Sequence, residues 1–375
     1  MSDRRSCYQT GLSGIWNESD GDKWTVGRGN PGLFKALEKI RVEGEVLDAS
    51  GQLATDFTGI VNPTVKDSKM TVTCLNNNNQ DDTPAFTFTD YPNTIFIGND
   101  SVRNGKFSFT FTVPKDISYS NLQGKMNLYA VDTENGHEAQ GNFDNFIVGG
   151  TSDTAETDTI GPEIRALYLN DTTFVDGGQV NTTPYFVAEL WDKSGVNITG
   201  SSVGHDMMLV IDESTVLSYN LNSYYELLPG EEGTGIVKFP IPALEPGKHT
   251  AEFWVWDILN NSTVRTFTFE VVEGLKPFLF DVIATPGIAR EQVTFHLMHN
   301  RPESRMRVGI MVYDLAGRQL WKHEESGTSG LFENYTVSWD LTCGGARMRP
   351  GVYIYRAAIS TDNSKDATKQ GSSSF

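Results

Sequence analysis

Apolar and polar residues alternate with a period of two along most of the chain, and Gly, Asn, Asp or Pro interrupts each run. Clear examples are the stretches 40–47, 85–89, 106–113 and 185–191. This pattern is typical of β-strands that bury one face. Asn104-Gly105 stands between two such runs and predicts a tight hairpin turn. We therefore expect an all-β protein.

Helical signals are scarce. The best candidate is Pro31–Lys39, where Asn30 can cap the first turn and Pro31 occupies the first helical position. The sequence predicts a helix of one or two turns there.

The strand runs group into three consecutive β-sandwich domains of the immunoglobulin-like kind, at residues 40–150, 160–273 and 274–363. In the second domain, about seven short strands follow one another at a spacing of about ten residues, which is typical of this fold. The polar and acidic residues 151–159 predict a linker. Residues 1–39 are expected to be disordered or to be the partial remnant of the end of a preceding domain, and residues 364–375 predict a disordered tail.

Charge and composition restrict the possible partners. The 375 residues include 30 Lys+Arg against 48 Asp+Glu, which gives a net charge of −18. Because a surface that binds nucleic acid or an anionic bilayer must be basic, we expect no nucleic-acid partner. No stretch approaches the roughly 20 apolar residues of a membrane helix, so we expect no direct membrane insertion. No secretory signal is visible in the first residues.

Residues that commonly carry enzyme chemistry are few and scattered. Cys7, Cys74 and Cys343 lie far apart, and their spacing fits neither a disulfide framework nor a zinc site. None of them stands in a context that suggests a Cys–His pair. His296 and His299 face opposite sides of a predicted strand, so they are not expected to chelate one ion. The sequence therefore predicts no catalytic residue, no cofactor-binding residue and no metal ligand.

Two features leave alternatives open. Asp153, Glu156 and Asp158 lie in the predicted linker and could hold calcium, or they could belong to a solvated linker; the polar run 17–22 has a similar composition. The pair Tyr224-Tyr225 could bind carbohydrate or protein, or could close one end of a sandwich.

Several motifs occur together in one order. They are Val113-Pro-Lys-Asp-Ile117, Phe146-Ile-Val-Gly-Gly150, Gly161-Pro-Glu-Ile-Arg165, Gly195-Val-Asn-Ile-Thr199, Gly204-His-Asp206, Trp256-Asp-Ile-Leu-Asn-Asn261, Val312-Tyr-Asp-Leu-Ala-Gly-Arg318 and Gly351-Val-Tyr-Ile-Tyr355. Over residues 40–365 the chain resembles the C-terminal, non-catalytic β-domains of the type IX secretion system sortases, which are PorU-like cysteine peptidases of the gingipain class. The third domain also resembles the immunoglobulin-like module shared with flagellar hook-capping proteins.

The resemblance implies a function for the chain. In that family a caspase-like domain with the catalytic Cys and His precedes the β-domains, and only Gly29-Asn-Pro-Gly-Leu33 is similar to the end of such a domain. We therefore expect a non-enzymatic accessory region at the cell surface, associated with the outer membrane. Its implied partners are the outer-membrane β-barrel component of the secretion system and the C-terminal signal domains of cargo proteins.

Departures and alternatives complete the expectation. The family usually ends with an apolar strand, whereas residues 364–375 are polar here, so we expect that strand to be missing and an edge to be exposed. A surface adhesin or carbohydrate-binding β-sandwich protein, and a cysteine peptidase fragment with residual activity, are the alternative functions.

Overall fold

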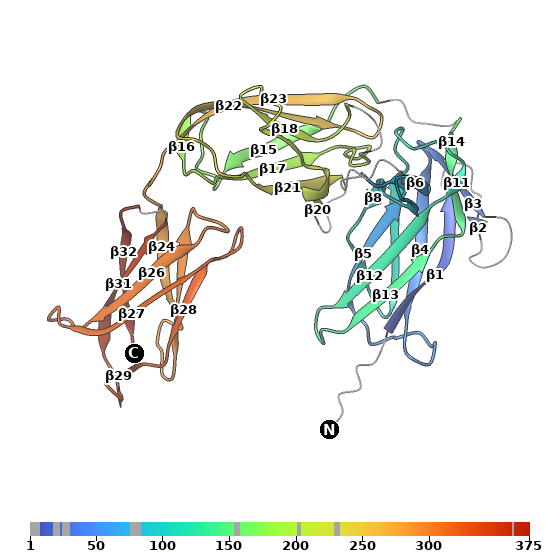
Figure 1. The fold of residues 1–375 in the computed structure, drawn as a ribbon. Helices are drawn as coiled ribbons and strands as arrows, with labels where there is room; N and C mark the ends of the chain where they lie inside the picture. Colours follow the sequence, from blue (N-terminus) through green and yellow to red (C-terminus); the bar gives the residue numbers. More distant parts are fainter. Residues whose placement is uncertain are drawn as a thin grey trace. The chain divides into compact units, whose positions relative to one another are not determined.

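The computed structural model describes residues 8–17, 23–24, 31–75, 84–153, 158–200, 204–228, 233–361 and 364–375. Apart from one 3-10 turn at Asn222–Tyr224, every regular element of these residues is a β-strand (Figure 1). The all-β prediction is confirmed. No helix in the described part of the chain has the length and apolar character needed to cross a membrane.

The chain divides into two compact units. The first comprises Met1–Ala166, Ala188–Val237 and Glu252–Thr266; the second comprises Leu167–Val187, Lys238–Ala251 and Phe267–Phe375. Because these units do not follow the predicted division into three sandwiches, the predicted domain boundaries stay predictions.

The first unit contains a nine-stranded sheet with the order β10-β4-β1-β13-β12-β5-β8, in which β2 also pairs with β1 and β9 with β5 (Figure 1). Its strands are β1 (Tyr8–Asn17), β2 (Lys23–Trp24), β4 (Lys39–Leu47), β5 (Gly59–Lys66), β8 (Thr94–Ile97), β9 (Asp100–Val102), β10 (Lys106–Thr112), β12 (Lys125–Asp132) and β13 (Glu138–Phe143). Two smaller sheets, β11-β14-β3 and β6-β7, consist of β3 (Gly32–Ala36), β6 (Met70–Thr73), β7 (Thr87–Asp90), β11 (Leu122–Gln123) and β14 (Phe146–Thr151).

Alternation along β10 builds the core of this region. Phe107, Phe109 and Phe111 are buried, while the residues between them are more exposed. Their rings stack in sequence, with centroids 6.5 and 6.3 Å apart. Asn104 and Gly105 both have positive φ, at 50° and 72°, as the predicted tight turn requires. The period of two therefore indicated both the strand and its buried face correctly.

The disorder expected for residues 1–39 is wrong wherever the structure describes them, whereas a remnant of a preceding domain stays a prediction. β1 lies inside the nine-stranded sheet, antiparallel to β4 and parallel to β13. A register shift between Leu12 and Gly14 breaks the alternation of β1, which explains why the sequence pattern did not indicate a strand. Residues 32–36 form β3 instead of a helix, because pairing with β14 buries Phe34 and Ala36 completely. Residues 1–7, including Cys7, lie outside the described residues.

Residues 163–271 form two further sheets, with the orders β15-β17-β21-β20 and β16-β23-β22-β18-β19. Their strands are β15 (Glu163–Leu169), β16 (Gly178–Val180), β17 (Tyr185–Trp191), β18 (Met208–Ile211), β19 (Ser218–Asn220), β20 (Tyr225–Leu227), β21 (Thr234–Pro240), β22 (Gly247–Trp256) and β23 (Ser262–Val271). The alternating burial of β22, with Ala251, Phe253 and Val255 inside, again follows the sequence pattern.

The C-terminal strands form the sheets β24-β25-β28 and β27-β26-β31-β32 in the second unit, with β29-β30 as a small hairpin (Figure 1). They are β24 (Leu279–Thr285), β25 (Val293–His299), β26 (Met306–Tyr313), β27 (Gln319–Gly327), β28 (Tyr335–Trp339), β29 (Thr342–Cys343), β30 (Ala346–Arg347), β31 (Val352–Ser360) and β32 (Ala367–Ser374). Trp321 stacks on Trp339 at 4.6 Å beside the buried Phe295.

The predicted disordered tail 364–375 and the expected missing final strand are both wrong. β32 pairs with β31 along its whole length, from Ala367 beside Ile359 to Ser374 beside Val352. Gly371, which the sequence pattern attributed to a flexible tail, is needed for packing: a β-carbon there would lie 2.4 Å from the Tyr355 ring. Backbone pairing, together with the buried Phe375, therefore outweighs the polar composition.

Candidate functional site

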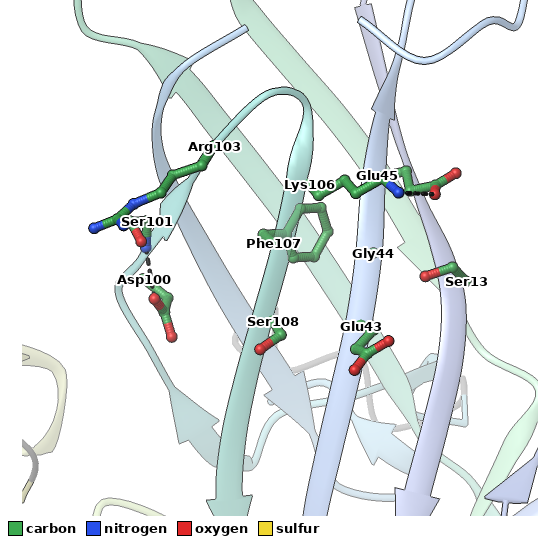
Figure 2. A pocket seen from close by; sticks show the side chains of 10 residues that line it. All are labelled: Ser13, Glu43, Gly44, Glu45, Asp100, Ser101, Arg103, Lys106, Phe107 and Ser108. Carbon is green, nitrogen blue, oxygen red and sulfur yellow. Dashed lines mark hydrogen bonds and ion pairs between the residues drawn. The ribbon is translucent and has the colours of Figure 1, made fainter. Parts of the chain in front are cut away.

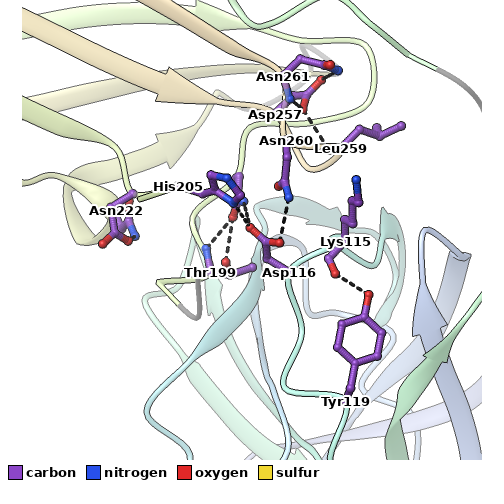
Figure 3. A network of polar contacts seen from close by, with 12 residues as sticks. Lys115, Asp116, Tyr119, Thr199, His205, Asn222, Asp257, Leu259, Asn260 and Asn261 are labelled. Carbon is purple, nitrogen blue, oxygen red and sulfur yellow. Dashed lines mark hydrogen bonds and ion pairs between the residues drawn. The ribbon is translucent and has the colours of Figure 1, made fainter. Parts of the chain in front are cut away.

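Four of the sequence motifs meet in the first unit at one network of polar side chains. Asp116 follows β10, Asn197 follows β17, His205 precedes β18, and Asn260 lies in the turn between β22 and β23. Figure 3 shows Asp116, His205 and Asn260 close together. All four loops lie at strand ends, where side chains are free of the sheet pattern. We take this network and the acidic cluster beside it as the candidate functional site.

Asp116 is the centre of the network and is only 8% exposed. One carboxylate oxygen lies 2.6 Å from Nδ1 of His205 and accepts a longer hydrogen bond from the Asn197 amide at 3.4 Å. The other oxygen accepts a hydrogen bond from the Asn260 amide at 2.9 Å (Figure 3). A buried carboxylate with several donors is well satisfied, so Asp116 can hold these loops together.

The backbone reinforces the same contact. The Lys115 amide donates to the Ile258 carbonyl at 2.8 Å, and the Tyr119 hydroxyl donates to the Lys115 carbonyl at 2.6 Å. His205 packs against Trp256 at 4.5 Å between ring centroids. The arrangement orients His205 and fixes the loop that carries Asp116.

Three aspartates form an acidic cluster at the base of these loops. Carboxylate oxygens of Asp158, Asp192 and Asp257 lie within 4.8 Å of one another. Asp192 is 4% exposed and Asp257 is fully buried. Burial raises the pKa of Asp192 to about 6, and the charges of Asp257 and Asp158 act in the same direction. Burial also raises the pKa of Asp257, whereas the hydrogen bond from the Ile160 amide lowers that of Asp158.

Backbone amides hold each carboxylate of the acidic cluster in place. Asp192 accepts hydrogen bonds from the amides of Ser194 and Gly195, both at 2.8 Å. Asp257 accepts from the amides of Leu259 and Asn261, at 2.9 and 2.7 Å. These local turns form because an aspartate that precedes Ser, Gly or Asn readily bonds the amides that follow it.

An open hollow lies elsewhere in the first unit. Figure 2 shows Glu43 and Glu45 on β4 and Lys106 on β10 around the ring of Phe107, which covers Gly44. The hollow is open, and Lys106 lies 3.9 Å from Glu45. It contains no pairing of a nucleophile with a base, so its residues do not indicate catalysis.

The cysteines and histidines that the sequence analysis considered have separate surroundings in the structure. Cys74 is exposed and Cys343 is half-buried, and both are free thiols. His296 contacts Thr285, whereas His299 contacts Ser329.

The open alternatives for Tyr224-Tyr225 and for the linker are resolved only in part. Tyr224 is 39% exposed, but Tyr225 is buried at 5% and cannot serve as an exposed aromatic surface. Asp158 joins the acidic cluster, Asp153 is exposed, and Glu156 lies outside the described residues.

Sequence reasoning did not identify Asp116, Asp192, His205 or Asp257 as site residues. All except Asp192 appear in motifs that were used only for the family resemblance. An aspartate at the end of an apolar strand, followed by turn residues, is the signal that could have found Asp192 and Asp257. Their proximity depends on strand order, which local pattern does not give.

Comparison with solved structures found a chain with clear sequence similarity to this one. The chain is 36% identical to dimeric latent PorU from Porphyromonas gingivalis, over 98% of this chain and 34% of that chain, with a TM-score of 0.43. The chain thus spans about one third of the length of that protein.

Two other solved structures are only distantly similar. A tetra-tandem repeat from the extending region of a large adhesion protein is 13% identical over 100% of this chain and 93% of that one, with a TM-score of 0.20. The N-terminal Ig1-2 module of the Drosophila receptor protein tyrosine phosphatase DLAR is 10% identical over 57% of this chain and 97% of that one, with a TM-score of 0.23. No protein-family model matches the chain, and no curated protein matches it.

Proposed function

We propose that the chain is a non-enzymatic, C-terminal accessory region of a PorU-like type IX secretion sortase, and that it docks proteins at the outer membrane and cell surface. The observation that carries this proposal is the 36% identity to PorU across nearly the whole chain. The proposed partners are the outer-membrane β-barrel component of the secretion system and the C-terminal signal domains of cargo proteins.

Exposed apolar side chains support a docking role. The hairpin strands β6 and β7 are exposed on nearly every residue, and Phe86 and Phe88 stack at 6.4 Å while 71% and 40% exposed. Met70 and Leu75 in the same hairpin region are 44% and 84% exposed. Apolar residues grouped in this way on a surface commonly mark an interaction site.

A second exposed position lies in the C-terminal part of the chain. Leu315 is 73% exposed in the turn between β26 and β27. The edge strand β27 is itself a poor template for an added strand, because Lys322, Glu324 and their neighbours place charges along it. We therefore propose that this part docks through the Leu315 turn instead of by strand addition at β27.

The test uses the full chain, exported with an added signal peptide in a bacterium that carries a type IX secretion system. We expect the chain to copurify with the outer-membrane barrel component and to crosslink to it in intact cells. The Phe86→Ser/Phe88→Ser double variant and the Leu315→Ser variant show which surface is used. Thr71→Ser is the matched control within the exposed hairpin. Absence of both copurification and crosslinking of the wild-type chain would refute the docking function.

A peptide-cleavage assay tests the non-enzymatic part of the proposal. We expect no cleavage of cargo C-terminal peptides by the full chain. Cleavage that disappears when Cys7, Cys74 or Cys343 is changed to Ala would instead support the alternative of a peptidase fragment.

A further inference from the structure

We propose that Asp158, Asp192 and Asp257 bind a divalent cation of the calcium type, and that the Tyr225 hydroxyl donates a hydrogen bond to this site. The three carboxylates come from different parts of the first unit: the segment before β15, the end of β17 and the turn after β22. An ion there would join these three segments directly.

The spacing of the carboxylates suits one ion. Calcium binds oxygen ligands at about 2.3–2.6 Å, so two of its ligands lie at most about 5 Å apart. Carboxylate oxygens of the three aspartates all lie within 4.8 Å of one another. The donor set consists of carboxylates only, which favours a hard cation over zinc or copper.

Charge also favours a cation at this place. Two of the three carboxylates are almost completely buried, so water screens their mutual repulsion poorly. The ammonium group of Lys193 acts on Asp158 and offsets part of this charge. The backbone amides around Asp192 and Asp257 prevent these carboxylates from turning apart. A divalent ion would remove the remaining repulsion without rearrangement.

An independent observation comes from Tyr225 on β20. Its side chain is 5% exposed, and its hydroxyl has no hydrogen-bond partner among the described residues. A buried hydroxyl without a partner is rare in folded proteins and calls for an explanation such as an ion or an ordered water.

The Tyr225 ring is directed toward the acidic cluster. Tyr225 pairs with Val237 of β21, but its hydroxyl lies over Gly235, where a β-carbon would be 2.3 Å away. The ring therefore extends back along β21 toward Gly233, whose carbonyl accepts the Asp192 amide at 3.0 Å. The charge of Asp192 adds to burial in raising the pKa of Tyr225. No carboxylate of the cluster lies within hydrogen-bond distance of this hydroxyl, so it would donate to a water bound on the ion.

The same turn serves both halves of the candidate site. Asp257 caps the turn that carries Asn260, and Asn260 donates to Asp116. The Asn261 amide group donates to Asp257 and to the Asp158 carbonyl. An ion at the cluster would therefore stiffen the turn that holds the Asp116 network.

The test uses the full chain freed of metal by a chelator. Terbium replaces calcium in oxygen sites and emits when excited through a nearby tryptophan, and Trp191 precedes Asp192 directly. We expect saturable terbium emission that calcium displaces more effectively than magnesium, with calcium affinity of about 0.1–1 mM as in extracellular modules. We also expect calcium to raise the melting temperature.

Three variants decide the assignment. Asp192→Asn should weaken calcium binding at least tenfold, and Tyr225→Phe should weaken it by a smaller factor. Asp314→Asn is the matched control, because Asp314 caps a turn with the amides of Ala316 and Arg318 but lies outside the cluster. No saturable terbium emission in the folded wild-type chain, or equal calcium affinity in Asp192→Asn, would overturn the proposal. Loss of docking with calcium binding intact would count against the proposed function alone.

Discussion

Replacing Phe375 by Ala tests whether the polar C-terminal segment belongs to the core. The ring is 8% exposed, lies edge-on to Trp339 at 5.6 Å and stacks on Tyr353 at 5.4 Å. The backbone of Phe375 exchanges two hydrogen bonds with Gly351, at 2.8 and 3.0 Å, and the Ala variant keeps both. The substitution therefore removes only the packing of the ring.

The expected loss can be estimated from this packing. Phe→Ala in a protein core costs about 3–5 kcal/mol, and the edge position of Phe375 favours the lower end of this range, about 3 kcal/mol. With a urea dependence of about 2 kcal/mol per M, the midpoint should fall by about 1.5 M.

Urea unfolding followed by tryptophan fluorescence measures the change, since Trp339 touches the substituted ring and stacks on Trp321. Gln370→Ala, at an exposed position of the same strand, is the control and should change stability by less than about 0.5 kcal/mol. If Phe375→Ala changes the unfolding free energy no more than this control does, the placement of β32 is wrong.

Three further predictions concern pH, close packing and the polar network. Burial lowers the pKa of His299 to about 4, so as pH falls the unfolded chain is protonated before the folded one. The free energy of unfolding should therefore fall as pH drops below about 6.5. In urea titrations the wild type should lose about 2 kcal/mol between pH 7.5 and 5.0 relative to His299→Asn. Gly44→Ala should cost about 1–3 kcal/mol, because its β-carbon would lie 2.1 Å from the Phe107 ring, whereas Gly309→Ala, with 3.7 Å of clearance, should be neutral or stabilising in the same assay. Asp116→Asn should lower the melting temperature and speed hydrogen exchange at the Lys115 amide. The substitution replaces one acceptor oxygen of the carboxylate by an NH2 group, which would face the hydrogen-bond donors around Asp116. Unchanged exchange would contradict the proposed role of Asp116.

The sequence pattern predicted strands well where one face is buried without interruption. β4, β10 and β22 follow the period of two, and Asn104-Gly105 turns as expected because both residues accept positive φ. The failures have physical causes. The bulge in β1 breaks its alternation, and β3 gains more from pairing with β14 than a short helix would gain from its cap. In β32, backbone pairing with β31 determines the structure, and the polar composition of the segment does not indicate this pairing.

The candidate site was less predictable than the fold. The sequence indicated Asp158 as a candidate calcium ligand because it belongs to an acidic stretch. In the structure its acidic neighbours are Asp192 and Asp257, which lie 34 and 99 residues further along the chain. Local sequence shows that each of these aspartates begins a turn. Only the order of strands in the sheets brings the turns together, and no local pattern specifies that order.

The position of β1 between β4 and β13 has a consequence for how the protein folds. Tyr8 pairs with Ala139, so the nine-stranded sheet joins residues separated by most of the first 143 positions. Strands so far apart in sequence pair slowly, because closing the long loop between them costs conformational entropy before any contact between them stabilises the chain. During synthesis, β1 and β4 can pair early, but the sheet is not complete until β13 has emerged. In that interval the chain presents an unpaired strand edge, and a chaperone that covers β1 should reduce its aggregation.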